Sequence, residues 1–151
     1  MASETVRDII DHVRAVHSQL SWFYQTLGDA AEKERLRMLL QYVSRHERNL
    51  EQALAKYQET ASGSVLNTWF KSAQDNPVRT CLQNIAITAD MSTDEVIRIV
   101  LAMDRCLVDT FGRIAESAPA AEVKALFQDL VRLEERQDHK LMRDALELED
   151  V

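Results

Sequence analysis

The sequence contains few of the residues that interrupt regular secondary structure. It has 3 glycines and 2 prolines in 151 residues, whereas all-β and loop-rich proteins use many of both in their turns. Ala, Leu, Glu, Gln and Arg are abundant instead, and these residues lose little conformational freedom in a helix. The composition therefore predicts an all-α fold. The length is that of one domain, so we expect residues 1–151 to form a single domain.

Long apolar runs and an excess of basic charge are also missing. No stretch approaches the roughly 20 apolar residues that a membrane span requires. The N-terminus, MASETVRDII, has neither the basic region nor the apolar core of a signal peptide. The net charge is −7, and a nucleic-acid partner would require a basic face. We therefore predict a cytoplasmic protein that binds neither membranes nor nucleic acids.

Cysteine is scarce as well. Cys81 and Cys106 are the only two, and they form neither a CxxC pair nor the spaced framework of a small disulfide-rich protein. Cytoplasmic thiols are normally kept reduced. The sequence therefore predicts two reduced cysteines that pack as small apolar side chains.

Apolar residues at steps of three and four predict long amphipathic helices. Gly28 suits a left-handed cap that ends the first of them, Asp29 suits an N-cap that begins the second, and Ser92 suits an N-cap that begins the third. Short connections then join the first helix to the second and the third to the fourth. The four predicted helices span about residues 4–27, 30–59, 93–117 and 120–148.

Residues 61–91 form the one long connection. Such a segment can run the length of a four-helix bundle and return the chain to its starting end. Within it we expect two short amphipathic helices separated by a break at Asn76-Pro77. The first would contain Val65, Leu66, Trp69 and Phe70, and the second would span residues 81–88. The sequence thus predicts an antiparallel four-helix bundle with a crossover.

The two hairpins resemble each other. A shift of 87 residues superposes the first hairpin on the second without a gap. Shared helical periodicity explains part of the apolar agreement, but polar identities are harder to obtain by chance. This alignment predicts an internal pseudo-twofold repeat. The polar matches pair Gln41 with Gln128, Arg45 with Arg132 and Glu47 with Glu134.

Each predicted helix has a polar residue in its apolar stripe. These residues lie at similar depths along their helices, and buried charges are costly unless they are paired or bind a metal. Three carboxylates and one imidazole suit iron or manganese. We therefore predict a metal site, with mutual neutralisation of a charged His17 by Glu47 as the alternative. The four residues are His17, Glu47, Asp104 and Glu134.

The other polar residues near the stripes have simpler interpretations. His12, His46 and His139 fall on other helical faces, where exposure is expected. Tyr24 lies within the first stripe. Its hydroxyl could reach a polar partner from the core, or it could serve as a redox neighbour of a metal.

The stretches LLQYVSRHERNL and LFQDLVRLEERQ resemble the second-helix motif of the ferritin-like superfamily, particularly its rubrerythrin-like branch. In that family each of two hairpins supplies a Glu from its first helix and a Glu-x-x-His from its second. The resemblance covers all four helices and the crossover. It implies that Glu47 and Glu134 stand at the motif glutamates, and that His17 and Asp104 replace the first-helix glutamates.

The two motif histidines are replaced by Leu50 and Gln137, so the sequence favours one metal ion over two. The resemblance implies a diverged carboxylate-rich centre that binds iron or a related metal, for metal handling or modest oxygen or peroxide chemistry. The alternative is a metal-free bundle that acts as an interaction or scaffold protein.

Assembly is the last expectation. Ferritin-like bundles commonly pair, which implies a homodimer or larger homo-oligomer. Trp69 and Phe70 in the crossover could anchor a protein partner, and Trp22 is a second candidate. The alternative is that Trp69 and Phe70 cover the end of their own core.

Overall fold

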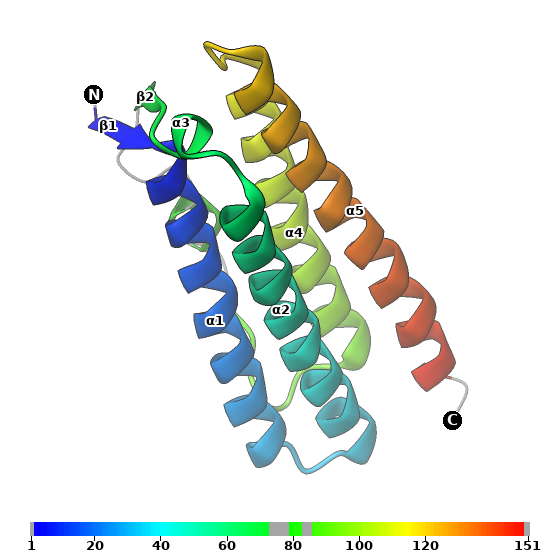
Figure 1. The fold of residues 1–151 in the computed structure, drawn as a ribbon. Helices are drawn as coiled ribbons and strands as arrows, with labels where there is room; N and C mark the ends of the chain where they lie inside the picture. The colour runs from blue at the N-terminus through cyan, green and yellow to red at the C-terminus, as the bar shows by residue number, and fades with distance from the viewer. Residues whose placement is uncertain (1, 73–78, 83–85, 150–151) are drawn as a thin grey trace.

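Four long helices dominate the computed structural model, which describes residues 2–72, 79–82 and 86–149. Helix α1 packs antiparallel to α2, and α4 packs antiparallel to α5 (Figure 1). The predictions of an all-α fold and of two helical hairpins are confirmed, and the helix ends differ from the expected ones by a few residues. The helices are α1 (Val6–Ala30), α2 (Glu34–Thr60), α4 (Thr93–Glu116) and α5 (Ala121–Glu149).

The predicted crossover is also confirmed. Helix α2 ends beside the start of α1, whereas α4 begins at the opposite end of the bundle (Figure 1). The chain therefore runs the length of the bundle between them. The described parts of the crossover contain α3 (Gly63–Leu66), strand β2 (Trp69–Ser72) and the 3-10 helix η1 (Arg79–Leu82).

The first short helix expected in the crossover is confirmed only at Val65 and Leu66, which lie in α3, and it was wrong for Trp69 and Phe70. That segment is β2, which pairs antiparallel with strand β1 (Ala2–Thr5), so that Thr5 lies opposite Trp69. Side chains alternate across a strand. Phe70 is accordingly buried and packs edge-on against Phe127, while Trp69 is 65% exposed. The N-terminal strand supplies the pairing that favours an extended conformation here, and local periodicity cannot reveal such a partner.

The second expected crossover helix, over residues 81–88, lies partly outside the described residues, since 83–85 are not among them. Only η1 is helical within residues 79–82 and 86–88. The predicted break at Asn76-Pro77 lies outside the described residues.

The helix caps agree with the sequence in one place and differ in another. The side chain of Ser92 accepts a hydrogen bond from the backbone N–H of Glu95, as expected of an N-cap. By contrast, α1 continues to Ala30 through Gly28, and Lys33 precedes α2 without a side-chain cap. A Cβ on Gly28 would lie 3.3 Å from Leu40 Cβ. This glycine therefore permits the close approach of α1 and α2 rather than a left-handed cap.

The cysteines are paired, so the expectation of reduced thiols was wrong. A disulfide joins Cys81 of η1 to Cys106 of α4, whose Cα atoms are 5.6 Å apart. The crossover brings η1 against α4 on its way along the bundle. Only this tertiary contact places together two cysteines that are 25 residues apart in the chain.

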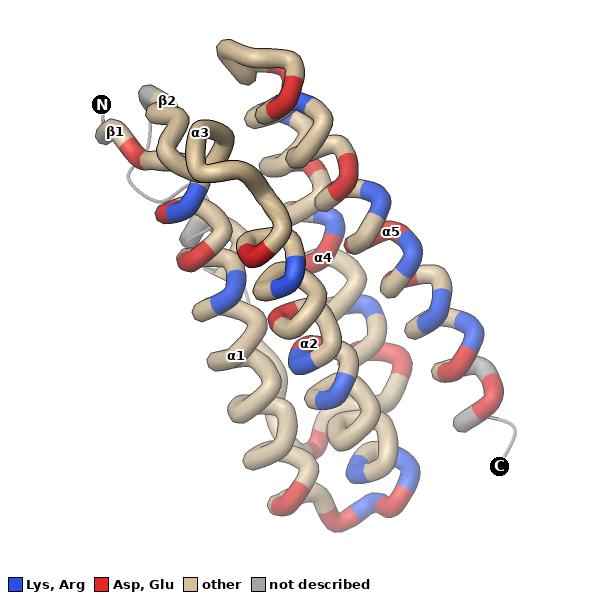
Figure 2. Tube along the Cα trace, viewed as in Figure 1, with Lys and Arg blue, Asp and Glu red and all other residues tan. Residues whose placement is uncertain are grey.

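Within the described parts of the chain, no helix is both long enough and apolar enough to cross a bilayer. The helices bury their apolar stripes against one another, and charged residues are distributed along all four long helices (Figure 2). The polar residues that remain inside form the cluster described next.

Candidate metal centre

His17 lies fully buried on α1 between two carboxylates from different hairpins. Its Nδ1 is 2.5 Å from Glu47 Oε2 on α2, and its Nε2 is 3.0 Å from Glu134 Oε1 on α5. Burial lowers the pKa of His17, but Glu134 and Glu47 raise it, and the net pKa lies well above the ordinary value. A doubly protonated imidazole can donate through both nitrogens. His17 therefore acts as a buried cation that links the two hairpins.

His46 and Asp104 form a second buried pair. His46 on α2 is only 4% exposed, and its Nε2 is 3.0 Å from Oδ2 of the fully buried Asp104 on α4. Burial lowers the pKa of His46 below its ordinary value, against the effect of Glu47 and Glu134. His46 is therefore a neutral imidazole at neutral pH, which is the form that binds metal ions.

Asp138 on α5 adds a fourth carboxyl group to this region. Burial raises the pKa of Asp138 to about 9, and a hydrogen bond with Asp104 raises it further. Burial likewise raises the pKa of Asp104 well above its usual range, with Glu47 and Glu134 adding to the rise. Like charges this close disfavour joint ionisation. In the metal-free protein Asp138 therefore stays protonated near neutral pH.

Glu47 and Glu134 each keep one buried oxygen without a hydrogen-bond partner, and Asp104 and Asp138 each have one whose only partner is the other of these two carboxyl groups. A buried polar atom left without a partner costs about 1–3 kcal/mol. The buried hydroxyl of Tyr24 has no hydrogen-bond partner either. Burial raises the pKa of Tyr24, and the nearby Glu47 and Asp104 raise it further. The cluster thus has carboxyl oxygens from three helices that could coordinate a metal ion. These oxygens are Glu47 Oε1, Asp104 Oδ1, Glu134 Oε2 and Asp138 Oδ1.

His46, Glu47 and Asp104 can hold one metal ion. Each offers a ligand atom within 4.8 Å of the others, and all three side chains are buried. The second oxygen of Glu47 is taken by His17 and that of Asp104 by His46. An ion would therefore find one free oxygen on each carboxylate. Two carboxylates and an imidazole are ligands that suit several divalent transition metals.

The structure brings together the four residues that the sequence proposed, in two linked groups. His17 contacts Glu47 and Glu134 directly, while Asp104 contacts His46. Because carboxylates occupy both nitrogens of His17, this residue holds Glu47 in place rather than offering a ligand atom. The metal role of the four predicted residues stays a prediction.

His46 was expected to be exposed, and this was wrong. Helix α2 contacts α1 on one side and α4 and α5 on the other. The buried part of its surface is therefore wider than its apolar stripe alone, and it includes both His46 and Glu47. Asp138 was not singled out from the sequence, although it lies four residues after Glu134 and so on the same helical face.

The other two histidines lie away from the centre, as predicted. His139 is exposed, and His12 is half-buried beside Glu4, with 3.1 Å between His12 Nδ1 and Glu4 Oε1. Neither contributes to the buried cluster.

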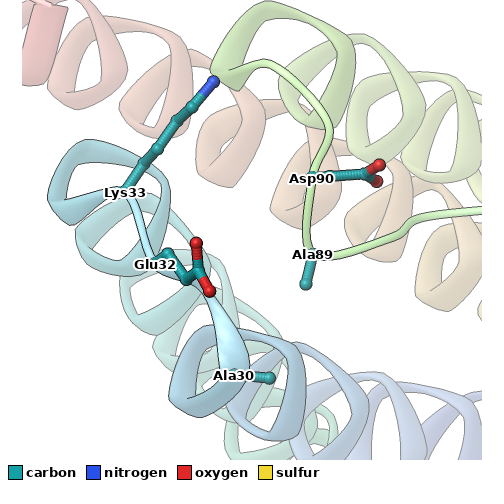
Figure 3. Close-up of a pocket in the computed structure, with 5 residues that line it drawn as sticks. All are labelled: Ala30, Glu32, Lys33, Ala89 and Asp90. Atoms are coloured by element: carbon teal, nitrogen blue, oxygen red, sulfur yellow. The ribbon is translucent and has the colours of Figure 1, made fainter.

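A separate pocket of about 390 Å³ lies at the end of the bundle where α1 turns into α2 (Figure 3). The loop that leads into α4 forms its other side. Glu32, Asp90 and Lys33 line it together with Ala30 and Ala89. This mixture of opposite charges on an exposed loop offers no converging set of metal ligands.

Comparisons with protein-family models, curated proteins and solved structures found no match to this chain. The site therefore has to be interpreted from its own chemistry.

Proposed function

We propose that the chain is a ferritin-like metal protein that binds one iron or manganese ion through His46, Glu47 and Asp104. The observation that carries this proposal is a set of four neighbouring buried carboxyl groups, each with one oxygen that no donor outside the four groups satisfies within the described residues. A divalent cation would coordinate the oxygens of Glu47 and Asp104 and offset the negative charge of the cluster.

The arrangement of the helices supports the ferritin-like part of the proposal. Two antiparallel hairpins and a crossover are the features of that architecture. The 87-residue repeat relates Glu47 to Glu134, and these two residues contact opposite nitrogens of His17. This shared contact supports the proposal that the two hairpins are related by an internal repeat.

Each residue of the cluster has a definite part in binding. His46 offers a neutral imidazole, and Glu47 and Asp104 offer carboxylate oxygens. His17 orients Glu47 and supplies a positive charge that limits repulsion among the carboxylates. Asp104 binds the ion in its ionised form, because a coordinating carboxyl must be ionised. A bound iron ion would supply the redox chemistry that metal handling or reaction with oxygen or peroxide requires.

Tyr24 fits this proposal as a buried neighbour. Burial raises the pKa of Tyr24, with further contributions from Glu47 and Asp104, so the phenol stays protonated. Its unpartnered hydroxyl could donate to a carboxylate or stand beside the ion as a redox neighbour. The second role remains a proposal.

Metal-dependent stability tests the proposed function. An ion that binds only the native state at 100 times its dissociation constant stabilises that state by about 2.7 kcal/mol. The melting temperature of the EDTA-treated protein is therefore expected to rise when anaerobic Fe(II) or Mn(II) is added. Thermal melts followed by circular dichroism measure the shift.

Two variants make this test specific. Glu47→Gln removes a proposed ligand and should abolish the metal-induced shift. Glu135→Gln changes an exposed carboxylate on α5 and should leave the shift unchanged. If the parent melts at the same temperature with and without the ions, the metal proposal fails and the scaffold alternative is favoured.

A role in association is the second candidate function, and two exposed tryptophans favour it. Trp22 on α1 is 70% exposed and Trp69 on β2 is 65% exposed. Large exposed aromatic side chains are common anchors at interfaces. Phe70, by contrast, is buried against Phe127 of its own chain, which supports the alternative that Phe70 covers its own core.

We therefore propose a homodimer or larger homo-oligomer anchored by Trp22 or Trp69. Light scattering should give at least twice the monomer mass for the parent, and the double variant Trp22→Ala/Trp69→Ala should be monomeric. The exposed Met142 provides the control Met142→Ala, which should keep the parent mass. A monomeric parent would contradict self-association.

A further inference from the structure

A second pocket lies between α2 and α5, directly outside the buried cluster. Its volume is about 230 Å³, which suits a ligand smaller than a typical drug-sized molecule. The side chains that line it and matter here are Arg45, Arg48 and Asn49 from α2, Gln137 and Lys140 from α5, and the buried His46. We call it the α2–α5 pocket.

The pocket is strongly basic in a chain whose net charge is −7. Arg45, Arg48 and Lys140 line it, and Figure 2 shows basic residues along both α2 and α5. Arg48 and Lys140 make no ion pair within the described residues. Two cationic side chains that share one small cavity repel each other. An anion between them would relieve that repulsion.

One carboxylate lines the pocket, and it is already engaged. The hydroxyl of Tyr42 donates to Asp144 Oδ2 at 2.5 Å, and Arg143 Nε lies 3.7 Å from Asp144 Oδ1. Asp144 therefore does not neutralise Arg48 and Lys140. The guanidinium of Arg45 stands 6.0 Å from the centre of the Tyr42 ring, at the outer limit of a cation–π contact.

The inner wall of the pocket is His46. Its side chain is nearly buried, yet it lines the pocket and also bonds to Asp104 through Nε2. Its Nδ1 makes no hydrogen bond within the described residues. A polar ligand in the pocket would thus lie directly beside His46, which is itself one of the proposed metal ligands.

We propose that the α2–α5 pocket binds a small oxyanion of the phosphate or carboxylate class. A guanidinium and an ammonium group are the usual partners of such oxygens, and the amides of Asn49 and Gln137 add neutral donors. The cavity volume accommodates one small ion with its hydration. This site does not depend on a bound metal, because the cations that form it belong to the protein.

The test uses EDTA-treated protein, so that its outcome is separate from that of the metal proposal. Isothermal titration with inorganic phosphate and, in a second arm, with acetate is performed at constant ionic strength set by sodium chloride. Saturable one-site binding is expected, and the arm with the tighter binding identifies the chemical class of the oxyanion.

Three variants test whether the residues of the α2–α5 pocket bind the oxyanion. Arg48→Gln and Lys140→Gln should each weaken binding about tenfold, since each removes one charge-assisted hydrogen bond. Arg98→Gln, which changes an exposed cation on α4, should bind as the parent does. Circular dichroism shows whether the variants remain folded. The proposal is overturned if the parent shows no saturable binding, or if all three folded variants lose affinity equally.

Discussion

Replacing His17 with leucine is expected to lower the free energy of unfolding by about 3–5 kcal/mol, because it removes the cation from a buried charge cluster. The imidazolium donates to Glu47 and Glu134 from the protein interior. Without it, both carboxylates are left buried without a compensating charge. Leucine has a similar volume, so the loss reports the charge rather than a cavity. Urea unfolding of the metal-free protein measures it.

An exposed histidine on α5 provides the control. His139 lies on the surface, and surface substitutions away from buried features usually change stability by less than about 0.5 kcal/mol. His139→Leu should therefore change stability much less than His17→Leu. The double variant His17→Leu/Glu134→Gln should recover part of the loss, since it removes one uncompensated carboxylate. Equal stability of the parent and His17→Leu would contradict the assignment of His17 as a buried cation.

Removing the disulfide is expected to lower the free energy of unfolding by about 3–4 kcal/mol, because a cross-link that closes a loop of this size restricts the unfolded chain. Cys81 and Cys106 are 25 residues apart. The double variant Cys81→Ala/Cys106→Ala, unfolded in urea, measures the loss. The parent in the presence of reductant should match the variant, whereas reductant should not change the variant itself.

A thiol count checks the state of the cysteines directly. Denatured protein that is alkylated without reductant should carry no label if the disulfide is present, and two labels if Cys81 and Cys106 are reduced. Cytosolic thiols are normally kept reduced. Two labels in protein kept from air would therefore contradict the disulfide and favour the cytoplasmic location that the sequence predicts.

The helices could be predicted from the sequence because their causes are local. Apolar residues at helical spacing define each buried stripe, and few glycines or prolines interrupt them. Ser92 begins α4 by a hydrogen bond that spans three residues. The long connection between two short-linked hairpins also implies the crossover. None of these features requires knowledge of contacts between distant segments.

Part of the cluster could be predicted for the same reason. His17, Glu47, Asp104 and Glu134 interrupt apolar stripes, and the structure buries all four. Burial of a residue within a stripe follows from the amphipathic pattern of its own helix. Which partner each buried side chain contacts does not follow from that pattern.

The tertiary structure alone decided the remaining features. His46 is buried because α2 contacts three other helices, and β2 exists because β1 pairs with it. Cys81 meets Cys106 because the crossover passes beside α4. Each of these depends on a partner that is distant in the chain, and helical periodicity describes only which face of a segment is apolar, not what packs against it.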